Sequence, residues 1–130
     1  MNFLIDHNLK GQAALLWGTI AAEGWLEIVP IRFVTFDQVN LSDDSSDYIV
    51  WQFCQTKQMI LITANRNMKG TDSLEQMIRE ENTATSLPIV TIGSKERLDE
   101  RVYRERCATR LIEILFDINN CMGVGRLYIP

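Results

Sequence analysis

Short apolar runs of strand length alternate along this chain with segments that carry a helical pattern. Three runs contain almost no polar residue and cover residues 2–5, 59–63 and 88–92. Continuous apolar strands of this kind are typical of a parallel sheet that is covered on both faces. We expect a less regular strand over residues 28–36, where Pro30 removes a ladder donor, and a last short strand within residues 125–130.

Helical patterns fill the segments between these runs. They cover residues 10–23, 47–57, 74–82 and 95–116. Ser94 is placed to cap the last of them, and Asp72 with Glu75 forms a capping-box pattern before the third. Four strand-then-helix units with short connections predict an α/β fold with a mainly parallel central sheet and helices on both faces. A chain of 130 residues forms one such domain, residues 1–130.

The composition indicates the cellular location of the protein and limits the kinds of partner that it can bind. The apolar runs are too short to span a bilayer and no signal peptide precedes them, so we expect a cytoplasmic protein without a membrane partner. The odd set Cys54, Cys107 and Cys121 predicts reduced, packed thiols. A formal net charge of −4 argues against a broad nucleic-acid footprint but leaves room for a local, metal-assisted phosphate site.

Several common catalytic motifs are absent from the sequence. No GxGxxG follows a strand, and neither GxxxxGK[ST] nor GxSxG occurs. The single histidine, His7, is assigned no role, because its side chain would face away from that of Asp6 on a continuing strand.

Polar oxygen ligands are placed where the predicted strands end. Asp6 ends the first strand, Asp47 lies in the first turn of the second helix, and Asn65 and Asn67 follow the third strand. The carboxyl ends of parallel strands meet at one edge of the sheet. Oxygen-rich clusters there suit Mg²⁺ or Mn²⁺.

Three segments together resemble a known family. They are FLIDHNL at residues 3–9, SDYIV at residues 46–50 and LITANRNM at residues 61–68. In order and spacing they are similar to the "FL-D-NL", "SD--I" and "L-T-D-DF" motifs of short bacterial PIN-like domains. The resemblance covers the first half of the chain.

The resemblance implies a three-layer α/β/α PIN-like fold and a Mg²⁺- or Mn²⁺-dependent nuclease, often the toxin of a toxin-antitoxin pair. Asp6, Asp47, Asn65 and Asn67 would form the catalytic set, with Asp6, Asp47 and Asn65 as metal ligands. In such sites metal ions activate a water for attack on a phosphate. The implied partners are RNA and an antitoxin-like protein. Apart from the resemblance, Trp17, Trp25 and Trp51 are candidates for core packing or for contact with a second copy of the chain.

The sequence departs from the family pattern at the later acids. Asn65 and Asn67 stand where the family has carboxylates, which removes two negative charges and weakens cation binding. Asp72, or the loop acids Asp43 and Asp44, could restore charge. Two functions therefore stay open: a hydrolase acting on RNA through an altered acidic site, or a catalytically inactive PIN-like binding and regulatory module.

Further residues are candidates for contact with the substrate or with solvent. Lys10, Thr63 and Arg66 are the candidate substrate-binding residues, and Asp72 is a supporting residue or a helix cap. Three arginines beside Glu100 and Glu105 predict a solvated, salt-bridged helix face: Arg97, Arg101 and Arg104.

Overall fold

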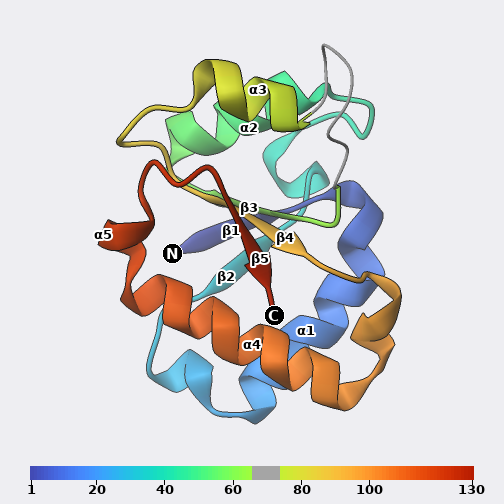
Figure 1. Cartoon of the computed structure of the whole chain (residues 1–130). Coiled ribbons are helices and arrows are strands. Elements are labelled where there is room, and N and C mark those ends of the chain that lie inside the picture. Colours follow the sequence, from blue (N-terminus) through green and yellow to red (C-terminus); the bar gives the residue numbers. More distant parts are fainter. Residues whose placement is uncertain (66–73) are drawn as a thin grey trace.

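The computed structural model describes residues 1–65 and 74–130 and shows a five-stranded, all-parallel sheet (Figure 1). The strand order is β2-β1-β3-β4-β5. The strands are β1 (Asn2–Ile5), β2 (Arg32–Val34), β3 (Ile60–Thr63), β4 (Ile89–Ile92) and β5 (Arg126–Ile129). The expected last strand at the C-terminus is therefore present.

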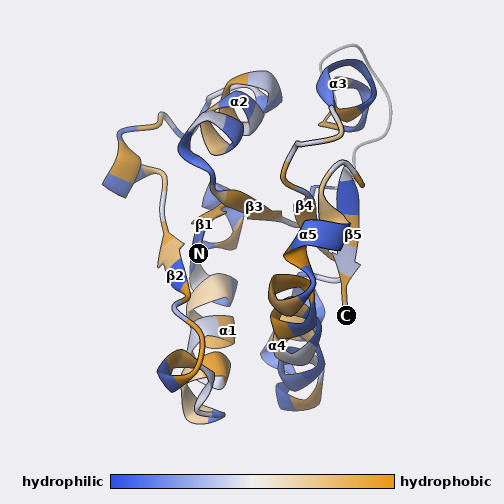
Figure 2. Ribbon diagram, turned by 90° about the vertical axis from the view of Figure 1, so that its left-hand side faces the viewer, coloured by the Kyte–Doolittle hydropathy of each residue, from blue (hydrophilic) through white to orange (hydrophobic). Residues whose placement is uncertain are grey.

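Helices cover both faces of the sheet and make three layers (Figure 2). One face carries α1 (Lys10–Ala22) and α4 (Arg101–Phe116), and the other carries α2 (Asp47–Lys57) and α3 (Leu74–Glu81). A short helix, α5 (Ile118–Cys121), leads toward β5. Four 3-10 turns complete the described elements: η1 (His7–Leu9), η2 (Trp25–Glu27), η3 (Asp37–Val39) and η4 (Glu96–Asp99). The predicted α/β/α architecture is confirmed.

Alternation along the strands divides the apolar side chains between two cores. Phe3 and Ile5 pack with the residues of α1 and α4, whereas Leu4 packs with those of α2 and α3. In β3, Ile62 faces the first core and Leu61 the second. Central strands that bury both faces read as continuous apolar runs, which is why the sequence revealed them.

The strand order reverses direction beside β1. The chain passes from β1 to β2 on one side and then to β3 on the other, so β1 and β3 are neighbours with Ile5 opposite Ile62. Their carboxyl ends flank a topological switch point, where a crevice opens and ligands bind in open α/β sheets. This is the edge on which the candidate site lies.

Two expected elements differ from the structure. The strand predicted over residues 28–36 is reduced to Arg32–Val34, because the amides of Ile28 and Val29 bond back to the carbonyl of Trp25 instead of joining the ladder. The helix predicted from Ser94 is broken at Glu100, which is extended. Ser94 Oγ accepts a bond from the amide of Arg97 and so caps only the 3-10 turn η4.

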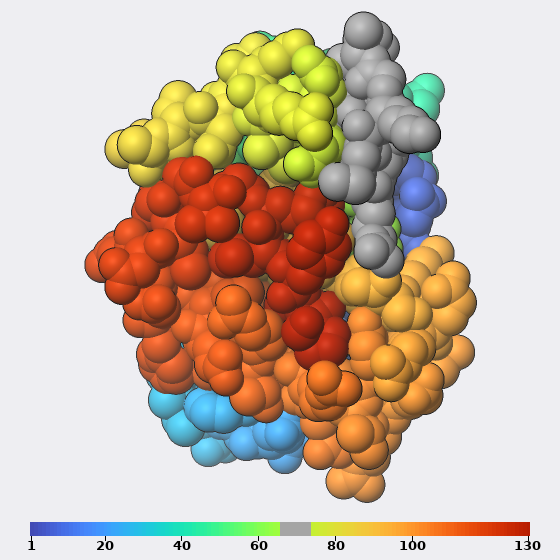
Figure 3. Space-filling model, viewed as in Figure 1, coloured from blue at the N-terminus to red at the C-terminus, as the bar shows by residue number. Residues whose placement is uncertain are grey.

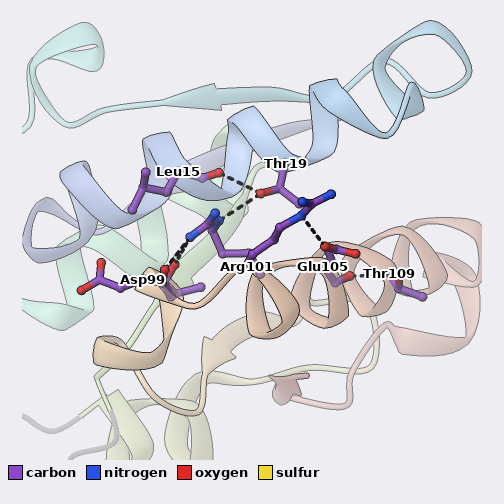
Figure 4. Close-up of polar contacts among 8 residues, drawn as sticks. Leu15, Thr19, Asp99, Arg101, Glu105 and Thr109 are labelled. Carbon is purple, nitrogen blue, oxygen red and sulfur yellow. Dashed lines mark hydrogen bonds and ion pairs between the residues drawn. The ribbon is translucent and has the colours of Figure 1, made fainter.

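The contacts of Arg104 explain the break in the helix. They also show that the solvated, salt-bridged position predicted for this residue is wrong. Its Nη1 donates to the carbonyls of Leu98 and Asp99, both at 2.9 Å, and its Nε donates to Thr19 Oγ1 at 3.1 Å. Figure 4 labels two of these acceptor residues, Thr19 and Asp99. Arg104 therefore joins η4, α4 and α1 rather than forming a solvated ion pair. Arg101 does pair with Glu105 on the surface, as predicted.

The three cysteines are free and buried, as the sequence predicted. No helix among residues 1–65 and 74–130 is long and apolar enough to span a membrane.

Candidate functional site

The carboxyl ends of β1 and β3 are joined through side chains as well as backbone. Asp6 directly follows β1, and its amide donates to the carbonyl of Ile62 at 3.0 Å. Thr63, the last residue of β3, is fully buried, and its hydroxyl donates to Asp6 Oδ2 at 2.6 Å. The Asp6 carboxylate is thus fixed at the switch point by the strand next to its own.

Asn65 extends this network to the second helix. Its amide N–H donates to Thr63 Oγ1 at 2.9 Å, and its Nδ2 lies 3.4 Å from Asp47 Oδ2. Asp47 is held in the first turn of α2, where Ser46 caps the helix by accepting a bond from the amide of Ile49. One network therefore connects Asp6, Thr63, Asn65 and Asp47.

The environment of Asp47 disfavours its negative charge. Burial raises the pKa of this carboxyl above its ordinary value, and the nearby negative charge of Asp6 raises it further. Hydrogen bonds from the Asn65 side chain and the Leu74 backbone, together with the charge of Arg126, lower the pKa but do not cancel the increase. The contacts of Asp47 therefore compensate its negative charge only in part.

A cavity of about 360 Å³ opens over these groups. Its lining contains Asp6, Asp47, Thr63 and Asn65, together with His7 and Lys95. Apolar side chains form part of its wall: Phe36, Val50, Leu61, Ala64 and Leu74. A pocket of this size, with a few converging polar groups, is suited to a small ligand or to one phosphate of a larger one.

His7 lies beside Asp6, which the sequence did not predict. The chain turns into η1 directly after Asp6, so His7 does not continue the strand. Its Nδ1 lies 3.4 Å from Asp6 Oδ1, and its ring packs 5.7 Å from that of Phe36. Because the chain leaves the strand conformation at η1, the alternation of side chains expected of a continuing strand does not apply to His7.

Arg126 is a second residue that sequence reasoning missed. It begins β5, and its Nη1 donates to the Asn65 carbonyl at 2.8 Å and to Thr91 Oγ1 at 2.6 Å. Its Nε donates to Glu75 Oε2 on α3 at 3.1 Å. The guanidinium therefore contacts the backbone of a candidate site residue.

The structure brings together four predicted site residues and places others elsewhere. Lys10 lines a separate cavity beside Trp17 and Phe33, and its Nζ lies 3.4 Å from Asp37 Oδ1. Asp43 and Asp44 do not line the site cavity, and the Asp44 carboxylate accepts a bond from the Ser42 hydroxyl. Three further candidates lie outside the described residues: Arg66, Asn67 and Asp72.

The donor set of the cavity is made of hard oxygen atoms. Two carboxylates, one hydroxyl and one amide are ligand types that Mg²⁺ and Mn²⁺ accept. Within the described ranges, no group of three or more His, Cys, Asp or Glu side chains is arranged to hold a metal ion. The charged side chains of the cavity that could act as cation ligands are Asp6 and Asp47.

Comparisons of the chain with protein-family models, with curated proteins and with solved structures find no match.

Proposed function

We propose that the chain is a PIN-like, Mg²⁺- or Mn²⁺-dependent ribonuclease with a reduced acidic site. One observation carries the proposal: the carboxylates of Asp6 and Asp47 line one cavity at the switch point of a parallel sheet. Open α/β sheets bind their ligands at this place. The sequence resemblance to PIN-like domains supports the same reading.

The charges of the cavity support a cation as the ligand of the two acids. Burial raises the pKa of Asp47, the negative charge of Asp6 raises it further, and the hydrogen bond from the neutral Asn65 side chain only partly offsets this increase. A divalent cation would neutralise both carboxylates and would favour their ionised forms. Without a cation, the ionised form of the Asp47 carboxylate opposes folding.

The remaining cavity residues are suited to a phosphodiester. A bound Mg²⁺ or Mn²⁺ supplies an activated water and neutralises charge on the phosphate. Lys95 and His7, which line the cavity, are donors for phosphate oxygens, and Thr63 holds the Asp6 carboxylate in a fixed orientation. Because the chain is acidic overall, we expect RNA to be held at this local site rather than over a broad basic surface.

The same proposal includes that the protein is the toxin of a toxin-antitoxin pair. The enzyme would act in the cytosol, where free thiols such as those of this chain stay reduced. An antitoxin-like protein would inhibit it by covering the cavity that holds Asp6 and Asp47.

A second candidate function is a catalytically inactive binding module. The observation that favours it is Asn65, which directs its amide nitrogen toward Asp47 and adds no charge to the site. In this reading the two acids and Asn65 recognise a ligand by hydrogen bonds without a cation.

Calorimetric titration of Mn²⁺ into chelator-treated protein separates the two functions. We expect a saturable heat from the wild type that disappears in Asp6→Asn. Asp117→Asn is the matched control, because Asp117 is exposed at the end of α4, where it bonds to Asn120 outside the cavity. Wild-type protein that gives no binding heat would contradict the cation site.

A cleavage assay then tests the reaction. The wild type with Mn²⁺ should cut single-stranded or structured RNA, and Asp6→Asn should lose this activity while Asp117→Asn keeps it. Cation binding without cleavage of any RNA would contradict the ribonuclease reaction while leaving the cation site in place.

A further inference from the structure

Arg126 is a buried charge at the amino end of an edge strand. Only 8% of its side chain is exposed, although β5 itself lies at the surface between α3 and α4 (Figure 3). The side chain runs along the sheet toward Thr91 and the residues after β3. Arg126 lies at the amino end of β5, but its side chain is long enough to reach Asn65, which follows the carboxyl end of β3.

Burying a guanidinium here is costly unless its donors are used. Glu75 supplies one carboxylate, and the Asn65 carbonyl and the Thr91 hydroxyl supply two neutral acceptors. Nη2 is buried and has no hydrogen-bond partner among residues 1–65 and 74–130. Since an apolar side chain of similar length avoids these penalties, stability alone is a poor reason for an arginine at this position.

Asn65 links Arg126 to both acids of the cavity. Its carbonyl accepts from Arg126, its amide N–H donates to Thr63, and its side chain contacts Asp47. Thr63 in turn donates to Asp6. A bond that fixes the Asn65 carbonyl restricts rotation of the backbone at Asn65, on which the direction of its side chain depends.

We infer that Arg126 is the positioning residue of the candidate site, holding Asn65 in the orientation that keeps the Asp6 and Asp47 carboxylates aligned on one cavity. The effect on cation affinity rests on the proposed function, whereas the effect on Asn65 does not. Groups that orient metal ligands change metal affinity about 10- to 100-fold when they are removed.

Arg126→Lys is the test variant because it keeps the positive charge and most of the apolar stem but loses the fork of donors. Arg104→Lys is the matched control. Arg104 is a second part-buried arginine that bonds two backbone carbonyls and a threonine hydroxyl, but it does so between η4, α4 and α1 (Figure 4). Both variants lose the same kind of contact, at different places.

The first measurement is amide hydrogen exchange by NMR on the complete chain without added metal. In Arg126→Lys we expect the Asn65 amide to exchange about tenfold faster or more, because its bond to Thr63 is less well held. The amides of Ile62 and Val90, inside β3 and β4, should exchange as they do in the wild type. Arg104→Lys should leave the Asn65 amide unchanged.

The second measurement is Mn²⁺ titration of the same proteins. Arg126→Lys should weaken binding by about 10- to 100-fold, and Arg104→Lys should not. If the wild type binds no Mn²⁺, the proposed function fails, and the exchange experiment alone decides the role of Arg126. If Mn²⁺ binds equally to the wild type and Arg126→Lys, the positioning role is overturned and the cation site stands.

Glu75→Gln is the alternative test variant if Arg126→Lys does not fold. It removes the carboxylate that orients the guanidinium at Nε and keeps the shape of the side chain. Faster exchange at Asn65 in Glu75→Gln would support the inference. An Asn65 amide that exchanges at the wild-type rate in this variant would overturn it.

Discussion

Thr63 donates a 2.6 Å hydrogen bond to Asp6, and this bond joins the carboxyl ends of the neighbouring parallel strands β3 and β1. The same hydroxyl accepts a bond from the amide of Asn65. One fully buried oxygen therefore serves a candidate metal ligand and the backbone of a second candidate site residue.

Replacing Thr63 by Val should destabilise the protein by about 1–3 kcal/mol. The substitution keeps the shape but leaves the Asn65 amide and one Asp6 oxygen without their partner in a partly buried region. Urea unfolding followed by circular dichroism measures the loss. Thr63→Ser keeps the hydroxyl and should retain most of the stability, and a Val variant as stable as the wild type would contradict the role of this bond.

Asp47→Asn should make the metal-free protein more stable at pH 7. In the folded state the pKa of Asp47 is raised by burial and by Asp6, so the ionised carboxylate opposes folding. This penalty is absent below the ordinary pKa of 3.8 and develops as pH rises from there through the raised, folded value. We expect a gain of less than about 1 kcal/mol, because solvent screens a half-buried carboxylate.

Urea unfolding of Asp47→Asn and the wild type at pH 7 and near pH 4 tests the sign. The difference between the two proteins should be larger at pH 7. An Asn variant that is less stable than the wild type at pH 7 would show that the Asp47 charge is favourable in the fold.

Gln55→Ala should cost about 1–3 kcal/mol of stability. The Gln55 side chain on α2 pairs with the backbone of Leu87 in both directions: Nε2 donates to the carbonyl at 3.1 Å, and Oε1 accepts from the amide at 2.9 Å. Removing it leaves both backbone groups of the buried residue Leu87 without partners. Gln52→Ala, at an exposed position of the same helix, should change stability by no more than about 0.5 kcal/mol in the same urea titration.

The cysteine thiols should react only when the protein unfolds. Burial raises the pKa of Cys54 to about 12 and that of Cys107 to about 11, and it also raises the pKa of Cys121. At pH 8 almost no thiolate is then present in the folded state. Labelling with a chromogenic disulfide should be slow in buffer and rapid for all three thiols in concentrated urea, and one fast thiol in buffer would contradict this packing.

The sequence predicts the layers of the fold because burial imposes a pattern on it. A strand covered on both faces has to be apolar throughout, as at Ile60–Thr63, and this pattern survives in the linear sequence. The break at Glu100 leaves no such trace. It depends on Arg104 taking two carbonyls of η4, which is a tertiary contact.

The sequence predicts those residues of the candidate site that lie at or directly after the end of a strand. Asp6, Thr63 and Asn65 are found because parallel strands bring their carboxyl ends together. Arg126 is missed because it lies 61 residues from Asn65 and at the amino end of its strand, so only the length of its side chain brings it to the site. The position of His7 depends on a turn that replaces the expected strand continuation.

The pairing of β1 with β3 also predicts that the site assembles late in folding. Asp6 and Thr63 are 57 residues apart, and the parallel ladder that joins them needs a crossover through two helices and β2. Contacts so distant in sequence form slowly, because the loss of chain entropy precedes the gain from packing. In a nascent or partly folded chain, Asp6 and Asp47 are therefore far apart. Their carboxylates come together only when the sheet is complete.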